Sequence, residues 1–279
     1  MKKYFLALTF AFLSVTLNAQ AQLETKKFKI SDICERTLDI VLTGNDAVDS
    51  VFREGMPNVW NISPYEFCTR GQFEERKKSK EYYFLMISDP AVGKQEDSGI
   101  RNLTVFKGDP SAGSGTDGLY RITTVPFCSA EGCGALAMAF LPALVDVLQQ
   151  HILSILDKEF NIGDMVKVNA LNSMAIWSKP VLMADSYMAV PPDDRMKGKN
   201  LVFAKEDEVI DAVRSGDERY LAAYCVAPSV LSKDAVCFTM VIDAQTHELY
   251  YLRHRKIGTS SPAGFVKADT DAILSHRKR

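Results

Sequence analysis

An uninterrupted run of eleven apolar residues at positions 135–145 sets the strongest limit on how this chain folds. A helix that is apolar on every side has to be buried, either in a protein core or in a membrane. A membrane span needs about 18 to 20 such residues, and Asp146 ends the run well short of that length. The next apolar residues recur at helical spacing as far as Ile155, with Gln149 and Gln150 free to face water. The sequence therefore predicts a long core helix, although a partner-binding helix that stays exposed until assembly would show the same pattern.

The first residues of the chain have the pattern of a secretory signal peptide. Lys2 and Lys3 precede an apolar segment, residues 4–17, and Ala19-Gln20-Ala21 matches an A-x-A cleavage site. We therefore expect an exported protein, periplasmic or secreted, whose mature part begins near Gln22 and contains no membrane span. The full chain has 33 basic and 35 acidic residues, a balance that gives no reason to expect a nucleic-acid partner.

Short strand patterns lie on both sides of the central helix. Apolar residues of the strand-forming type predict strands at 58–62, 82–87, 102–106 and 119–127, and again at 200–204, 220–227, 235–242 and 249–257. Helical spacing predicts helices at 31–54, interrupted by a turn at Gly44-Asn45, and at 206–214. Ser63-Pro64-Tyr65-Glu66 has the form of a capping box, which predicts another helix from there to about Lys78.

The strands of the second half repeat the order of the first. Three local likenesses support a duplication, and they pair Asn58-Val-Trp with Asn200-Leu-Val, Tyr82…Pro90 with Tyr220…Pro228, and Leu119-Tyr120 with Leu249-Tyr250. The sequence thus predicts an α+β protein, with mixed or antiparallel sheets built from a duplicated β-α-β-β-β unit around the long central apolar helix. The predicted organisation is a signal peptide at 1–21, a first α+β lobe at 22–130, the central helix and connector at 131–199, and a second α+β lobe at 200–279.

All six cysteines lie beyond the predicted signal peptide, which in an exported chain suggests disulfides. When the two halves are aligned, Cys225 and Cys237 match Ile87 and Leu103. We therefore expect the two cysteines to lie opposite each other in a hairpin. A disulfide between them would contribute about 3 kcal/mol in the chain-entropy model, and two buried thiols are the alternative.

Cys133 is the candidate for nucleophilic chemistry. It lies just before the central helix, and a thiol at a helix N-terminus has a lowered pKa, which favours the thiolate. The run from Cys133 to Met138, Cys-Gly-Ala-Leu-Ala-Met, resembles the nucleophile helix of papain-like cysteine peptidases, in particular the bacteriocin-processing group. The resemblance implies a cysteine hydrolase in which Cys133 acts with a histidine, here His247 or His254. A bridge between Cys133 and Cys128, or a buried thiol, is the alternative.

The chain departs from the peptidase pattern at two places. The family has a glutamine shortly before the cysteine, and residues 127–132 contain none. The family's histidine opens an apolar strand, and the best counterpart strand, residues 237–243, opens with Cys237. The flanking residues Gly132 and Gly134 permit close approach of backbone or of a ligand.

No cofactor or metal site is predicted. The segment 113–118 matches G-x-G-x-x-G, but a strand pattern follows it where a dinucleotide site needs a helix. The four histidines are scattered and no Cys-x-x-Cys occurs, so metal-ligand spacing is absent. The sequence therefore favours an exported, soluble, non-enzymatic protein that binds a small molecule or a protein partner, or assists assembly. A papain-like cysteine hydrolase with Cys133 as its nucleophile is the alternative function.

Overall fold

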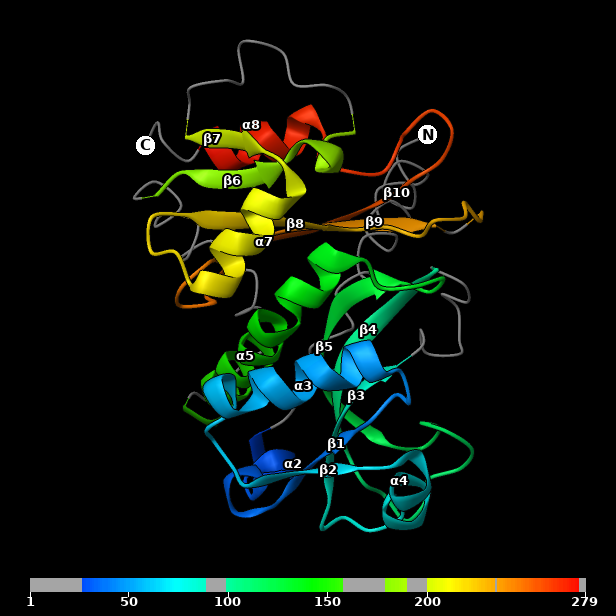
Figure 1. Cartoon of the computed structure of the whole chain (residues 1–279). Helices are drawn as coiled ribbons and strands as arrows, with labels where there is room; N and C mark the ends of the chain where they lie inside the picture. Colours follow the sequence, from blue (N-terminus) through cyan, green and yellow to red (C-terminus); the bar gives the residue numbers. More distant parts are fainter. Residues whose placement is uncertain (1–26, 89–98, 158–178, 190–199, 234, 276–279) are drawn as a thin grey trace, which may run out of the picture.

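The computed structural model describes residues 27–88, 99–157, 179–189, 200–233 and 235–275 of the chain. The predicted signal peptide, residues 1–21, lies outside this part. The described strands form two five-stranded sheets, one in each half of the chain, and helices lie between them (Figure 1). We refer to each sheet with its own helices as a lobe.

Sheet A belongs to the first lobe and has the strand order β2-β1-β3-β4-β5. Its strands are β1 (Leu38–Val41), β2 (Tyr65–Cys68), β3 (Tyr83–Ser88), β4 (Ile100–Lys107) and β5 (Tyr120–Ser129). Strand β1 pairs in parallel with both β2 and β3, whereas β3, β4 and β5 form an antiparallel meander. The helices of this lobe before β3 are α2 (Lys27–Ile30), η1 (Ile33–Glu35), α3 (Asp46–Val59) and α4 (Arg70–Arg76).

Sheet B repeats this arrangement in the second lobe, with the strand order β10-β9-β8-β6-β7. Its strands are β6 (Val181–Ala184), β7 (Leu201–Ala204), β8 (Leu221–Val226), β9 (Val236–Asp243) and β10 (Leu249–Lys256). Strand β6 pairs in parallel with both β7 and β8, and the other neighbours are antiparallel. The helices of this lobe are η3 (Asp185–Tyr187), α7 (Glu206–Ser215) and α8 (Lys267–Ser275).

One helix in each lobe has the same type of N-terminal cap. Before α4 the backbone N–H of Thr69 donates to the Gln72 side chain, and before α7 that of Lys205 donates to the Glu208 side chain, both at 2.8 Å. Each of these helices leads from the edge strand beside the first strand to the third strand of its sheet. The α+β class and the repetition of one sheet order are thus confirmed, while the lobe boundaries stay predictions.

The predicted helices at the start of the first lobe are partly wrong. The expected helix at 31–54 contains strand β1, whose four residues are all buried between two parallel neighbours. This strand has only four residues and includes the charged Asp39, so its sequence shows no pattern that separates it from the helices on either side. The helix expected from Ser63 onward is also wrong at its start, because β2 occupies that stretch and α4 begins only after Thr69.

The alignment of the repeat has one error. The strand expected at 58–62 is the end of α3 and the turn after it, so the pairing of Asn58 with Asn200 fails. The true counterpart of β7 is β2, since each lies at the edge of its sheet beside the first strand. The first strand of the second lobe, β6, had no prediction.

Helix α5 (Ala135–Asp157) lies between the two sheets, as the apolar run predicted (Figure 1). It packs beside α3 and α7, and the inner faces of both sheets join these helices in one continuous apolar core. The helix is long and apolar enough to cross a membrane, with a mean hydropathy of 1.5, but 67% of its most apolar window is buried inside the protein. The hypothesis of an exposed partner-binding helix at 135–145 is therefore wrong for this structure.

Gln149 of α5 was expected to face water but is buried instead. Its side-chain amide donates to the carbonyl oxygen of Val59 at 2.8 Å and accepts a hydrogen bond from the N–H of Asn61 at 2.7 Å. These bonds pair backbone groups at the end of α3, which explains a polar side chain in the core.

Sheet B also has an outer face, turned away from α5 and covered by α8 (Figure 1). Successive residues of β8 alternate between the two faces. The side chains of Ala222, Tyr224 and Val226 pack in the central core around α5. Those of Leu221 and Ala223 pack in a second apolar cluster on the outer face, here called the outer core. Cys225 follows this alternation and packs on the outer side.

Candidate functional site

Cys128 and Cys133 meet at the junction between β5 and α5. Their sulfur atoms lie at disulfide bonding distance, and their Cα atoms are 5.2 Å apart. This is the pairing that the sequence offered as the alternative to a nucleophile. A sulfur held in a disulfide carries no thiolate, so Cys133 cannot act as a nucleophile while this bond is intact.

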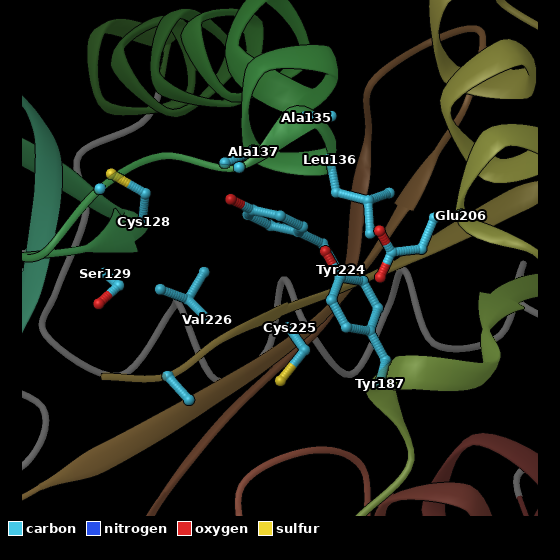
Figure 2. A pocket seen from close by; sticks show the side chains of 13 residues that line it. Cys128, Ser129, Ala135, Leu136, Ala137, Tyr187, Glu206, Tyr224, Cys225 and Val226 are labelled. Atoms are coloured by element: carbon cyan, nitrogen blue, oxygen red, sulfur yellow. The ribbon is translucent and has the colours of Figure 1, made fainter. Parts of the chain in front are cut away.

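A pocket opens beside this disulfide, between the two lobes (Figure 2). Its volume is about 220 Å³. The first lobe borders it with Cys128, Ser129 and the first turn of α5, and the second lobe borders it with Tyr187, Glu206 and Tyr224. Because the walls come from both halves of the chain, the pocket exists only when the two lobes are packed together.

The second lobe supplies three polar side chains of the pocket, those of Tyr187, Glu206 and Tyr224, and the first lobe supplies Ser129. Figure 2 shows Tyr187 and Glu206 on the side of the pocket away from Cys128. Glu206 is exposed, and its Oε1 accepts a hydrogen bond of 2.6 Å from the Ser186 hydroxyl. Burial raises the pKa of Tyr187 well above its usual value, so this hydroxyl stays neutral. The pocket thus contains a carboxylate acceptor and a hydroxyl that can donate or accept.

Tyr224 connects the pocket to the central core. Its ring stacks on Phe140 of α5 with ring centroids 4.4 Å apart, and it lies 6.2 Å from the ring of Tyr187. Its hydroxyl donates a hydrogen bond to the carbonyl oxygen of Phe127 in β5. One side chain of the second lobe therefore contacts both α5 and sheet A at the edge of the pocket.

The first lobe borders the pocket with small residues. A Cβ atom at Gly132 or Gly134 would meet no heavy atom within 4 Å, so both positions leave open space. Helix α5 starts after Gly134, whose carbonyl oxygen accepts from the Met138 N–H at 3.1 Å. The backbone amides of a first helical turn have no acceptor within the helix, and no acidic side chain occurs in this turn of α5. Hydrogen-bond donors therefore lie at this border of the pocket.

The structure does not bring the two candidate histidines to Cys133. His247 lies in the turn between β9 and β10, with its Nδ1 3.0 Å from Oδ2 of Asp146. Asp146 is about 16 Å along the axis of α5 from its first residue. The ring of His254, on β10, packs 5.7 Å from that of Phe238. Neither histidine borders the pocket, and the hydrolase stays a prediction without a Cys–His contact behind it.

The second cysteine pair lies on the outer side of sheet B. The sulfur atoms of Cys225 and Cys237 are 3.5 Å apart, as two free thiols in contact. The predicted register is wrong by two residues, because Cys225 lies opposite Thr239 and Cys237 is its diagonal neighbour. The expected proximity is present, while the disulfide itself stays a prediction.

Sequence patterns did not single out Tyr187 or Glu206. These residues lie in η3 and at the start of α7, and only the packing of both lobes places them at the start of α5. The glycine pair around Cys133 was the one usable signal. Within the described ranges, no three His, Cys, Asp or Glu side chains gather as a metal site would require.

The surroundings of the pocket are the basis for a functional conclusion, because comparison with known proteins adds none. No protein-family model matches the chain, and no curated protein or solved structure gives a significant match. The likeness to papain-like cysteine peptidases is thus confined to the six residues from Cys133 to Met138.

Proposed function

We propose that this protein is an exported, non-enzymatic binding protein whose ligand occupies the pocket between the lobes. The observation that supports this most strongly is the origin of the walls, since each half of a repeated fold supplies one side of the pocket. Ligand pockets commonly lie at interfaces between packed units. The pattern of residues 1–21 supports export. The bond between Cys128 and Cys133 disfavours the cysteine hydrolase.

The proposed ligand is small and polar. A volume of about 220 Å³ lies below the range of about 300–1,000 Å³ that is usual for drug-sized ligands. Glu206 and the Tyr187 hydroxyl can form hydrogen bonds on one side of the pocket, and the amides at the start of α5 can donate on the other. A molecule the size of an amino acid, with both donor and acceptor groups, suits these surroundings.

A thermal-shift screen of the mature protein tests the proposal. The probes are free amino acids, small hydroxy acids and monosaccharides. A ligand at about 100 times its dissociation constant stabilises the folded state by about 2.7 kcal/mol, which raises the Tm of a chain of this size by roughly 5–10 °C. We expect at least one of these classes to produce such a rise, and a flat response to every probe contradicts the proposal.

Two glycine variants locate the binding site. Gly132→Leu places a side chain in the open space of the pocket, and Gly258→Leu is its matched control. Both glycines pair with a serine in an isolated bridge, and a Cβ atom added at either position would meet no heavy atom within 4 Å. The rise in Tm should vanish in Gly132→Leu and persist in Gly258→Leu. A full rise in Gly132→Leu would place the ligand elsewhere.

A further inference from the structure

The thiols of Cys225 and Cys237 lie between the pocket and the C-terminal part of the described chain. Cys237 is fully buried, whereas Cys225 is partly exposed and also borders the pocket. Their sulfur atoms are 3.5 Å apart, and a disulfide requires about 2.05 Å. The two residues occupy diagonal positions on β8 and β9, and at the usual spacing of such neighbours, about 7–8 Å, closing the bond draws the two strands together.

The surroundings of Cys237 favour its thiolate. The Gly264 N–H donates to its sulfur at 3.4 Å, and Arg255 lies opposite it in the register of β9 and β10. The hydrogen bond from Cys225 lowers the pKa of Cys237 to about 7, and Gly264 and Arg255 act in the same direction against the effect of burial. The same hydrogen bond raises the pKa of Cys225, so Cys237 is the first of the pair to ionise, and the thiolate is the form that exchanges with disulfides.

Residues 262–266, here called the strap, connect these thiols to the pocket wall. The Arg255 guanidinium holds the strap by donating to the carbonyl oxygen of Gly264 at 2.8 Å. The next residue, Phe265, donates its N–H to the carbonyl oxygen of Tyr187 at 2.6 Å. Direct contacts thus run from Cys237 through the strap to a residue that borders the pocket. Strand β8 is a second connection between the thiols and the pocket, because it contains Cys225, which borders the pocket.

We propose that Cys225 and Cys237 form a reversible disulfide that alters the wall of the inter-lobe pocket and so regulates ligand binding. This inference rests on the proposed function of that pocket. Closing the bond pulls β8 and β9 together at diagonal positions and removes the thiol acceptor of the Gly264 N–H. Both changes act on segments that border the pocket or contact its wall.

The oxidant is an external disulfide, from oxidised glutathione or from another protein. Cys225 transfers its proton to the neighbouring Cys237 thiolate and attacks the external disulfide, which forms a mixed disulfide and releases an external thiolate. That external thiolate takes up the proton and restores the Cys237 thiolate. The Cys237 thiolate then attacks the Cys225 sulfur, which forms the internal bond and releases the second external thiol. The cysteine pair loses two electrons and two protons, and the external disulfide gains both.

Alkylation and hydrogen exchange on the full mature chain test this inference without any ligand. The Cys34→Ser background removes an exposed thiol. This protein is equilibrated with varied ratios of reduced to oxidised glutathione, alkylated, and mapped by mass spectrometry. We expect Cys225 and Cys237 to become protected from alkylation together. In the oxidised protein, amides of 185–189 and of the strap should exchange at least about tenfold faster.

Three variants separate this pair from the other thiols. Cys225→Ser and Cys237→Ser should each abolish the change in exchange, and Cys225→Ala serves if the serine variant does not fold. Cys68→Ser is the control, because burial raises the pKa of that thiol to about 12 and it should respond like the parent. A pair that stays alkylatable at every ratio, or a bond that forms without altering exchange in either segment, overturns the inference. The thermal-shift screen on the reduced protein tests the proposed function separately.

Discussion

Gly55 sets the closest approach between α3 and α5. A methyl group at this position would lie 2.8 Å from Cγ and 3.1 Å from Cβ of Pro142. The proline ring is stiff, so only a movement of one helix relieves the clash. We predict that Gly55→Ala lowers the free energy of unfolding by about 1–3 kcal/mol, although alanine is the better helix former. Urea denaturation followed by circular dichroism measures this change.

Gly71 in α4 provides the control for that experiment. Its added methyl group would lie 3.8 Å from the Thr69 hydroxyl, an ordinary contact. Gly71→Ala should therefore raise the free energy of unfolding by up to about 1 kcal/mol through helix propensity alone. A stabilising effect of the same size at Gly55 would contradict the packing argument.

Among the elements, α8 is held on sheet B by a buried carboxylate as well as by apolar packing. Asp269 is 0% exposed and accepts hydrogen bonds from the Tyr251 hydroxyl, the Arg253 guanidinium and the Val266 N–H, at 2.8, 3.1 and 2.9 Å. Removing the carboxylate leaves these donors without their acceptor. We predict that Asp269→Ala lowers the free energy of unfolding by about 2–4 kcal/mol, measured by urea denaturation.

Asp271 on the same helix is the matched control. Its ion pair with Lys267 is exposed, with 57% and 75% of the two side chains accessible. Exposed pairs of this kind contribute little, so Asp271→Ala should change stability by less than about 0.5 kcal/mol. Equal losses in the two variants would contradict a special contribution of the buried carboxylate.

The sequence predicts best those elements whose local pattern agrees with their place in the fold. Helix α7 is capped by Gly216, which adopts a left-handed conformation with φ of 63°, and its range agrees with the helix predicted at 206–214 and with the strands predicted on either side. Strand β1 was missed because it has only four residues and includes the charged Asp39. Ser63 was a misleading cap signal, since pairing of β2 with β1 draws the following residues into the sheet. Tertiary pairing outweighs local propensity at both places.

The candidate site was predictable only where its residues are neighbours in the sequence. Cys128 and Cys133 are five residues apart, and a turn between them brings their sulfur atoms together. Tyr187 and Glu206 come to the same pocket through the packing of two lobes, which no local pattern encodes. The residue predicted opposite Cys225 was wrong, because the length of the loop between β8 and β9 sets the pairing register of the two strands. Alternation of side chains alone does not determine that register.

At the scale of the whole molecule, the largest apolar core of the described residues spans both lobes. We therefore predict a single cooperative unfolding transition, with equal calorimetric and van't Hoff enthalpies. Leu144→Ala in α5, at a side chain that is 0% exposed, should cost about 2–5 kcal/mol and lower the protection of β3 and β8 amides together in hydrogen exchange. Two separate transitions, or a loss of protection in one lobe alone, would contradict a shared core.

The position of α5 in the chain has a consequence for biosynthesis. The helix leaves the ribosome before β6 to β10 exist, yet the inner face of sheet B forms part of its burial site. Until those strands are made, the face of α5 that packs against α7 and sheet B has no partner and is open to aggregation. We therefore expect the nascent chain to be most prone to aggregation from the moment its central helix emerges until the second lobe is complete.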